Sequence, residues 1–403
     1  MDIILDLLLI VLSLWWIALP ILLVPTILST VLFWRRRLYV AKKMDSVLLE
    51  LKIPPDLLRS PAAMEQVLVS LHGLRNKPFN WRGYHWGGEI PRWSSLEIVS
   101  QGGSGSIRFF MRVPTDFRNI VEASLFSYYP EIEVGIADDY VSKLPSTVQD
   151  LENDGLDMWF AELTLAKDPI IPLRTYKEFN IGEEGGMDPL SSLVEVMGKI
   201  PEHAFAGIQI VISPAGKEWT VGGRDAIEQL RGLDKILTPG ETTSISSIEA
   251  NVSKPAFYVL ARTLYIAPKE GFSSDFVGTA VANAFNQLSS PNHNKFANNF
   301  STTPSFKKRG LKKILRGRGL WSYRNRSIPE DLKAGQVLTY GRFYNLINEK
   351  WTAINVEGLA TLFHPLSSSV LTAPHLERLP SKRISAPAGL NIYGDEEAIK
   401  RFL

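Results

Sequence analysis

An uncharged apolar stretch opens the chain, from Leu7 to Trp34. At about 1.5 Å of rise per residue, a helix of this length would reach roughly 42 Å, whereas the hydrocarbon core of a bilayer is about 30 Å thick. We therefore expect one membrane-spanning helix, with the surplus taken up by tilt or interfacial burial. A cleaved signal peptide fits less well, because Asp2 and Asp6 precede a run that is too long for one.

Positive charge follows this stretch directly, at Arg35, Arg36, Arg37, Lys42 and Lys43. Positively charged flanks remain on the cytoplasmic side of a membrane. The pattern therefore predicts a single-pass cell-membrane protein with its N-terminus outside and its C-terminal bulk in the cytoplasm. Trp34 and the three arginines after it form the predicted membrane flank.

The next apolar positions follow helical spacing. Residues 36–51 are predicted to form a helix that leaves the membrane. A second helix is predicted to begin at Ser60 and Pro61, an N-cap residue followed by proline, and to end at Gly73. Residues 76–92 are interpreted as a connection rich in Trp and Gly.

An alternation of period two then changes the picture. Residues 93–100 and 106–113 have strand character and are joined by a glycine-rich turn, so they are predicted to pair as a hairpin. A helix is predicted after Pro114, and further strands at 131–136 and 158–165. The order of strand, strand, helix and strand fits an α+β sandwich of the ferredoxin-like kind.

A second series of elements repeats this order. Its predicted elements are strands within 203–213 and at 256–267, helices at 190–197, 225–237 and 273–288, and a polar loop at 239–253. The predicted fold class is therefore α+β, with an N-terminal transmembrane helix followed by two ferredoxin-like α/β sandwich units in tandem. The predicted segments are a transmembrane anchor (1–34), juxtamembrane helices and a connection (35–92), a first α+β unit (93–180), a second α+β unit with a basic loop (181–330) and a C-terminal extended segment (331–403).

The polar and then basic stretch 289–327 is predicted to be a loop. Its candidate contacts for phosphate or lipid headgroups are Lys307, Lys308, Arg309, Lys312, Lys313, Arg316 and Arg318. Trp321 and Tyr323 are the candidates for stacking on nucleic-acid bases. Such a segment could follow a phosphate backbone or meet acidic lipid headgroups. A solvated loop between packed elements has the same composition, so three interpretations remain open.

Composition limits the chemistry. The chain has 403 residues, a net charge of +2 and no cysteine, which excludes disulfides, thiolate nucleophiles and cysteine-ligated metals. None of the six histidines has the spacing of a metal motif, and neither a phosphate loop nor a GxSxG elbow occurs. We therefore expect a non-enzymatic protein without cofactor or metal. A Ser-His-Asp triad assembled from distant residues is the alternative left open.

Four segments carry a resemblance to a known group of proteins. They are LKIPPDLLRSPAAMEQVLVSLHG, SLEIVSQGGSGSIRFFMRVP, VEASLFSYYPEIEVGIADDY and INVEGLATLFHP, in this order from Leu51 onward. They resemble the N-terminal, non-catalytic domain of unknown function of membrane-associated bacterial proteins related to conjugative type IV secretion ATPases. In those relatives the last segment leads into a motor with a Walker loop, which this sequence lacks up to Leu403. The resemblance implies either a motor in a separate chain or a protein that works without one.

The resulting hypothesis is a membrane-anchored scaffold or adaptor that faces the cytosol and docks an ATPase of the type IV secretion or DNA-transfer kind. Its expected partners are the membrane and that separate motor. One alternative is a membrane protein that contacts nucleic acid through its basic loop, residues 307–326. The other is a membrane-bound hydrolase with a spatially assembled triad.

Overall fold

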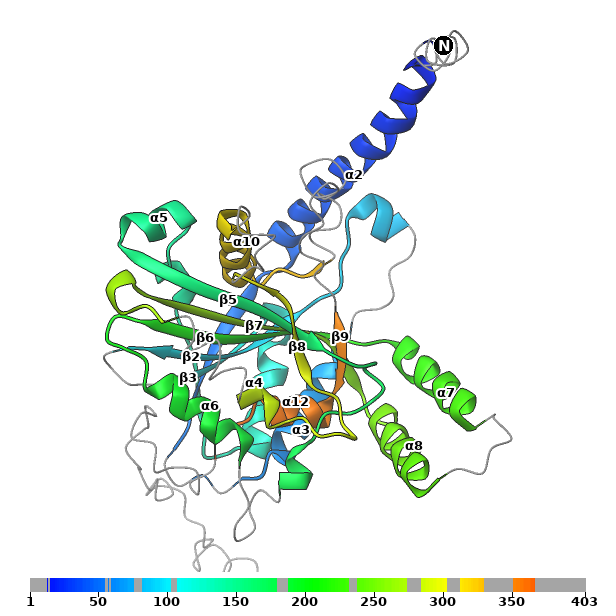
Figure 1. Ribbon diagram of the computed structural model, residues 1–403, viewed down its shortest axis with the longest axis vertical. Coiled ribbons are helices and arrows are strands. Elements are labelled where there is room, and N and C mark those ends of the chain that lie inside the picture. Colours follow the sequence, from blue (N-terminus) through cyan, green and yellow to red (C-terminus); the bar gives the residue numbers. More distant parts are fainter. Residues whose placement is uncertain are drawn as a thin grey trace, which may run out of the picture.

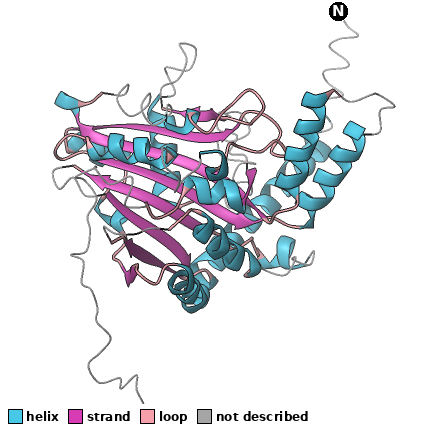
Figure 2. Cartoon of the chain, turned by 90° about the horizontal axis from the view of Figure 1, so that it is seen from below, coloured by secondary structure: helices cyan, strands magenta, loops and turns pink. Residues whose placement is uncertain are grey.

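Strands that alternate with helices build one large antiparallel sheet in the computed structural model of the chain (Figure 1). The structure describes residues 13, 15–54, 57, 59–75, 82–102, 107–179, 188–231, 238–273, 284–302, 312–329 and 351–366. Seen from below in Figure 2, the strands form one layer with helices on both sides. The predicted α+β class is confirmed at this level.

The described part of the sheet has nine strands, eight of them in the order β4-β1-β3-β2-β6-β7-β5-β8. The strands are β1 (Ser46–Lys52), β2 (Ser94–Gln101), β3 (Ile107–Pro114), β4 (Glu133–Ile136), β5 (Leu156–Leu165), β6 (Phe205–Pro214), β7 (Ala256–Pro268), β8 (Phe296–Ser301) and β9 (Thr352–Asn355). β9 pairs with the first residues of β7, beyond the end of β5.

The helices lie on both faces and at the ends of this sheet. They are α2 (Trp15–Lys43), α3 (Ala62–Gly73), α4 (Arg118–Tyr128), α5 (Val148–Asn153), α6 (Pro189–Gly198), α7 (Lys217–Arg231), α8 (Pro239–Val252), α10 (Lys312–Asn325) and α12 (Val356–Leu362). Short helical turns occur at η1 (Gly83–Gly87), η2 (Thr115–Phe117), η3 (Tyr140–Lys143), η4 (Tyr176–Phe179) and η5 (Lys269–Gly271).

The two halves of the sheet share one strand order. In the first half β1, α3, β2, β3, α4 and β4 follow one another, and the strands lie in the order β4-β1-β3-β2. In the second half β5, α6, β6, β7 and β8 give the equivalent order β8-β5-β7-β6. The halves join where β2 and β6 pair antiparallel, with Ile98 opposite Ile208.

Side-chain alternation along the strands creates a core on each face. The larger core packs residues such as Ile210 against α3, α4, α6 and α12. On the opposite face, residues such as Phe110 pack against α5 and α10. The C-terminal part of α2 also packs on this second face, through Tyr39 and Val40, together with Met44 just after the helix.

Several segments differ from their predictions. Residues 36–51 divide between α2 and β1, because the run Val47–Leu51 suits a buried strand as well as a helix. The predicted loop 239–253 forms α8, and the predicted loop 289–327 contains β8 and α10. The strand at 158–165, placed in the first unit, pairs as β5 with β7 and β8 of the other half.

Other predictions fall partly outside the described residues. Positions 103–106 of the glycine turn and 274–283 of a predicted helix belong to this group. The predicted extended segment 331–403 contains β9 and α12, and its remainder, 331–350 and 367–403, is not described.

The N-terminal helix α2 extends away from the sheet (Figure 1). Residues 7–12 and 14 of the predicted membrane span are outside the described part of the chain. Among the helices that the structure does describe, none combines the length and the apolar character required for a membrane crossing.

Candidate functional site

The basic segment is the first candidate, and its described part folds as α10. Lys312 and Lys313 are exposed in the first turn, and Lys313 Nζ lies 3.8 Å from a carboxylate oxygen of Glu152. Both lysines are therefore positioned where a phosphate group could reach them. The predicted contacts outside the described residues are Lys307, Lys308 and Arg309.

Other predicted contacts of α10 face the interior. Arg316 is buried, and its Nη2 lies 2.5 Å from Oδ1 of Asp157. Tyr323 is fully buried, and its hydroxyl lies 3.0 Å from that of Tyr140. Burial raises the pKa of Tyr323, so the phenol stays neutral. The base-stacking role predicted for Tyr323 is therefore corrected, because its ring is inaccessible to a base.

Arg318 and Trp321 are partly exposed neighbours on α10. The guanidinium carbon of Arg318 lies 5.0 Å from the centroid of the Trp321 ring, within the range of cation–π attraction. A base could stack on that ring face only by displacing the arginine. The stacking role of Trp321 and the phosphate role of Arg318 stay predictions.

Beneath α10, a charged network is buried where the two halves join. Glu97 of β2 is fully buried and accepts hydrogen bonds from Nε and Nη2 of Arg326, at 2.6 and 3.0 Å. Arg326 also donates to both carboxylate oxygens of Asp139, at 2.7 and 2.9 Å. The Tyr140 hydroxyl donates to Glu97 at 2.7 Å. These contacts fix the end of α10 to β2 and to the segment before η3.

The groups in this network keep their charges despite burial. Burial opposes ionisation of Glu97, but the charge and hydrogen bonds of Arg326 lower the pKa of the carboxyl. The same balance lowers the pKa of Asp139. Burial, together with the neighbouring Arg326 charge, lowers the pKa of Arg112 to about 10. Removing one partner would leave an uncompensated buried charge, which costs more than the pair gains when formed.

A similar ion pair is buried in the second half. Nε of Arg262, on β7, lies 3.0 Å from Oε2 of Glu162, on β5, and both side chains are almost fully enclosed. Arg262 also donates through Nη1 to the Ser322 carbonyl oxygen at 3.2 Å. Arginines from the sheet and from the end of α10 thus hold this helix against both halves.

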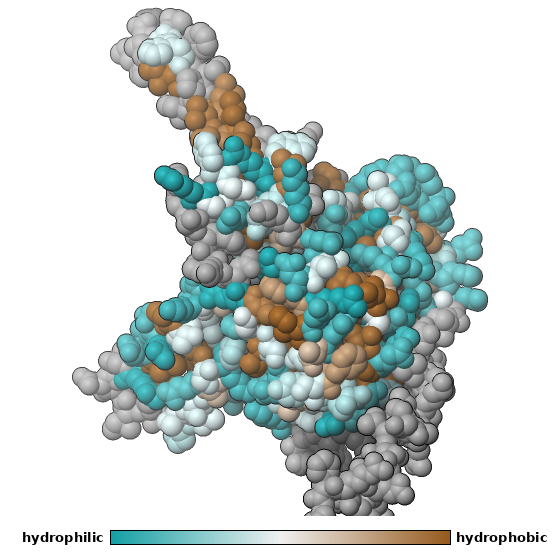
Figure 3. Space-filling view, turned by 180° about the vertical axis from the view of Figure 1, so that it is seen from behind, coloured by the Kyte–Doolittle hydropathy of each residue, from teal (hydrophilic) through white to brown (hydrophobic). Residues whose placement is uncertain are grey.

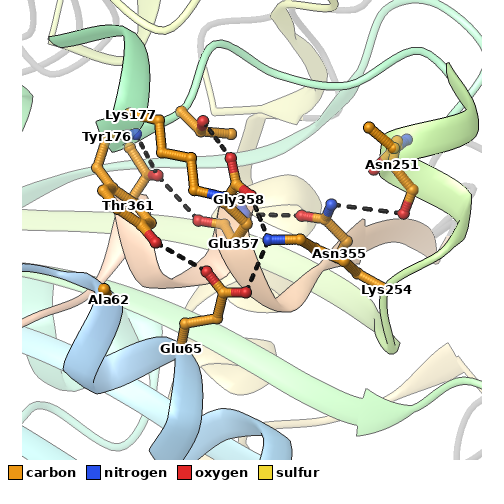
Figure 4. Close-up of polar contacts among 12 residues, drawn as sticks. Ala62, Glu65, Tyr176, Lys177, Asn251, Lys254, Asn355, Glu357, Gly358 and Thr361 are labelled. Atoms are coloured by element: carbon orange, nitrogen blue, oxygen red, sulfur yellow. Dashed lines mark hydrogen bonds and ion pairs between the residues drawn. The ribbon is translucent and has the colours of Figure 1, made fainter. Parts of the chain in front are cut away.

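A third polar cluster joins the C-terminal segment to the body (Figure 4). The Glu357 carboxylate, at the start of α12, accepts hydrogen bonds from Thr175 at 2.5 Å and Lys177 at 2.8 Å, and also pairs with Lys254. Lys254 in turn lies 2.7 Å from Glu65 of α3. Burial opposes both charges, but these hydrogen bonds lower the pKa of Glu357 and raise that of Lys254.

The same segment ends in a buried histidine contact. His364 Nδ1 lies 2.7 Å from the Ala360 carbonyl oxygen, and Nε2 lies 2.9 Å from Oδ2 of Asp188. Asp188 also caps α6 by accepting a hydrogen bond from the Leu190 N–H at 2.9 Å. Burial opposes ionisation of Asp188, but His364 lowers the pKa of the carboxyl. Each ring nitrogen of His364 therefore faces an acceptor oxygen, and the ring links α12 to the start of α6.

A serine, a histidine and a carboxylate also meet near η4. Ser290 Oγ lies 2.7 Å from Nδ1 of His293, and Nε2 of His293 lies 3.1 Å from Oε1 of Glu178. Ser290 and His293 belong to one tight turn, closed by a 3.1 Å backbone hydrogen bond. The contact chain could move a proton from the hydroxyl to the ring, but a turn of this kind also forms for structural reasons alone.

The predicted membrane flank is where α2 meets the body. Trp34 is 62% exposed, whereas Arg36 is buried. Arg35 donates to the Trp86 carbonyl oxygen, and its guanidinium carbon lies 4.9 Å from the indole centroid. Gly88 has φ +71°, and a Cβ there would lie 2.6 Å from the carbonyl carbon of Arg35, so only glycine fits. The side chain of Arg37 is not among those described.

Sequence patterns singled out the basic segment and predicted a membrane flank but missed the buried networks. The partners of Glu97, Glu357 and His364 are far away in the chain, so no local motif announces them. Glu97 does leave a signal, because a carboxylate alternates with apolar residues within a strand covered on both faces. Among the described residues, no group of three or more His, Asp or Glu side chains could hold a metal ion.

Comparisons with known proteins leave the family open. No protein-family model and no curated protein sequence matches this chain.

Proposed function

We propose that this protein is a membrane-anchored, cytosol-facing scaffold that docks a separate motor ATPase of the type IV secretion or DNA-transfer kind. The observation that carries the proposal is the apolar surface of α2, whose described residues form brown patches on the helix that projects from the body in Figure 3. Its exposed large apolar side chains are Trp16, Ile17, Leu23, Val24, Ile27, Leu28, Val31, Trp34 and Leu38.

In the sequence, the apolar stretch is as long as a bilayer crossing requires. The stretch Trp15–Trp34 has no charged residue, and at about 1.5 Å per residue it extends roughly 30 Å, the thickness of the hydrocarbon core. Apolar surface exposed to water costs about 25 cal/mol per Å², a cost that lipid contact removes. The arginines and lysines that follow favour a cytoplasmic body, and the close approach of Gly88 to Arg35 holds that body at a fixed place on the helix.

The symmetry of the sheet supports a scaffold. Each half has the strand order of a ferredoxin-like unit, and we take the two halves as duplicated units joined through β2 and β6. The buried carboxylates Glu97 and Glu162 and the partly buried Glu357 are each engaged by donors of the protein itself. Such contacts stiffen a structure rather than supply an acid or base, which agrees with the non-catalytic domain that the sequence resembles.

Alkaline extraction of native membranes tests the anchor. Full-length protein is expected to stay in the membrane pellet, whereas a variant with lysine at Leu23, Ile27 and Val31 is expected in the supernatant. Lysine at Ile120 and Phe126, two exposed apolar residues of α4, is the matched control and should leave the protein in the pellet. Release of the unaltered protein by carbonate alone would contradict the anchor.

Crosslinking in native cells tests the docking role. After solubilisation in mild detergent, affinity capture of the full-length protein is expected to recover an ATPase with Walker motifs. Capture that recovers partners but no ATPase would contradict the motor-docking role and leave the anchor standing.

A second candidate function, hydrolysis, is favoured by the contact chain of Ser290, His293 and Glu178. If it is a catalytic triad, a fluorophosphonate probe should label the folded protein, and Ser290→Ala should abolish labelling while Ser289→Ala does not. Absence of labelling in the unaltered protein removes this candidate.

Nucleic-acid contact is favoured by the exposure of Lys312 and Lys313. Reversal of both charges should weaken DNA or RNA binding and flatten its salt dependence. Reversal at Lys143 and Lys217, exposed lysines elsewhere, is the control. Binding that does not respond to salt would exclude a phosphate contact.

A further inference from the structure

A polar cavity lies where α2 meets the sheet. Its volume is about 440 Å³, and its lining includes Tyr39 and Lys42 of α2, Asp45 between α2 and β1, Arg92 before β2, and Asp116 of η2. Three segments distant in sequence, 39–45, 92 and 114–116, therefore line one space. Two of the lining side chains are cationic and two are anionic, so this open cavity carries both signs of charge.

The charges are only partly satisfied by the protein. Within the described residues, Lys42 has no ion-pair partner, and the Asp45 carboxylate accepts one hydrogen bond, from the N–H of Ser46 at 2.9 Å, and feels the charge of Arg112. Arg92 lies 3.3 Å from Asp116, which remains mostly exposed. The guanidinium of Arg92 rests over the Phe117 ring at 4.8 Å, which holds its plane in place. A ligand with separate positive and negative groups could therefore engage both remaining charges.

The cavity lies close to the predicted membrane surface. Lys42 follows Trp34 by about eight residues, roughly 12 Å along the helix. The polar headgroup layer is about 5–7 Å thick on each side of the hydrocarbon core. Helix tilt shortens the distance, and side chains on a helix lean toward its N-terminus, here toward the bilayer. The long stem of Lys42 can therefore bring its ammonium group into the headgroup layer.

We propose that this cavity binds the zwitterionic headgroup of phosphatidylethanolamine. Its phosphate would contact Lys42 and Arg92 and accept a hydrogen bond from Tyr39, and its primary ammonium would lie between Asp45 and Asp116. This proposal rests on the membrane anchor proposed above. Burial, together with the nearby Glu89, raises the pKa of Tyr39, which keeps its hydroxyl available as a donor.

Headgroup chemistry gives the site its selectivity. Phosphatidylcholine carries a quaternary ammonium without N–H donors, so it cannot hydrogen-bond to the two carboxylates. Phosphatidylglycerol carries no cation and would leave both carboxylates facing its own negative charge. The ethanolamine lipid alone among the three satisfies every charged group named here.

The test uses the full-length protein in nanodiscs that contain equal parts of the three lipids. Native mass spectrometry after mild release is expected to retain the ethanolamine lipid over either competitor by roughly tenfold, as for one charge-assisted hydrogen bond. Asp45→Asn with Asp116→Asn should remove this preference, and Lys42→Gln should weaken retention of all three lipids. Lys143→Gln is the control, with unchanged thermal unfolding as the check on folding.

Each contrary outcome has one meaning. Preference for phosphatidylglycerol, or no preference, overturns the headgroup site. Equal binding of soluble phosphoethanolamine by detergent-free protein overturns the lipid source. Carbonate extraction of the same protein separates these outcomes from failure of the anchor, because an anchored protein without lipid preference contradicts the site alone.

Discussion

The two halves of the sheet have the same strand order but differ in the segments that connect and flank their strands. Both have the strand order 4-1-3-2, yet only residues 102–106 lie between β2 and β3, whereas the helices α7 and α8, here called the helical arm, lie between β6 and β7. In Figures 1 and 2 this arm projects beside the sheet. The first half instead carries α2 at its start. The halves therefore share the strand order of the sheet, and they differ in α2 and in the helical arm, which lie at its end and in a connection.

The two halves also differ in the close contacts made at their glycines. A Cβ at Gly102 would lie 1.8 Å from the Pro201 carbonyl oxygen, which places the first hairpin against a loop of the other half. A Cβ at Gly223 would lie 2.2 Å from the Val252 side chain, which brings α7 and α8 together. Gly102 therefore allows a close contact between the halves, whereas Gly223 allows α7 and α8 to pack together within the second half alone.

The largest expected effect comes from substitutions that break the buried ion pair of each half separately. Arg326→Ala and Arg262→Ala should each lower the free energy of unfolding by about 3–5 kcal/mol, because each leaves a buried carboxylate without its partner. Urea unfolding measures both. Lys199→Ala, which removes an exposed pair with Glu195, should cost at most about 1 kcal/mol. A loss below that level for either arginine would mean that α10 is not held to that half.

A smaller effect should separate the arm from the sheet. Gly223→Ala forces a clash with Val252 and should destabilise α7 and α8 by about 1–3 kcal/mol. At Gly222 a Cβ meets nothing within 4 Å, so Gly222→Ala should stabilise α7 by about 0.5–1 kcal/mol. Hydrogen exchange should report both changes in the arm alone. Equal loss of protection in β2 and β3 would show that the arm is part of the common core.

A third set of substitutions removes helix N-caps, each of which contributes about 1 kcal/mol to the free energy of unfolding. Thr147 begins α5 and Thr238 begins α8, each with a reciprocal capping box. Replacement of either threonine by alanine should cost about 1 kcal/mol, and replacement by serine much less, because serine keeps the accepting oxygen. The Thr238→Ala variant should lose hydrogen-exchange protection only in α7 and α8. A global loss of stability from that variant would contradict the independence of the arm.

The smallest effect is a pH dependence in the second half. Because the pKa of Asp188 is lowered in the folded state, its pair with His364 contributes stability above the unfolded pKa of about 4, and this contribution is lost as the pH falls through the folded pKa. Asp188→Asn should therefore be less stable than the unaltered protein at pH 7, and the gap should narrow toward pH 3. A gap independent of pH would mean that the Asp188 charge does not matter.

Local patterns predicted the sheet well. The alternation around Phe109 and the run around Leu260 each gave a strand close to its observed position, because side-chain period and turn residues are local signals. β1 was missed because Leu48, Leu49 and Leu51 suit either element. α8 was missed because Ser and Thr are weak helix formers, although Thr238 and Glu241 already formed a recognisable capping box in sequence.

The candidate sites were harder to predict, because they depend on contacts between distant residues. Arg316 looked like a surface cation until its pairing with Asp157 placed it inside. The contact between Arg326 and Glu97 was equally hidden from local patterns, because the two residues lie more than two hundred positions apart. Net charge in a segment does not distinguish a cation that binds a partner from one that pins a helix.

The central claim is that α2 anchors the sheet to the inner side of a membrane. The chain has no cysteine, so single cysteines placed at Asp2 and at Ser60, an exposed residue of the body, can be labelled with a membrane-impermeant maleimide in intact cells. The account predicts labelling of the Asp2→Cys protein in intact cells and of the Ser60→Cys protein only after permeabilisation. Labelling of the Ser60→Cys protein in intact cells would contradict it.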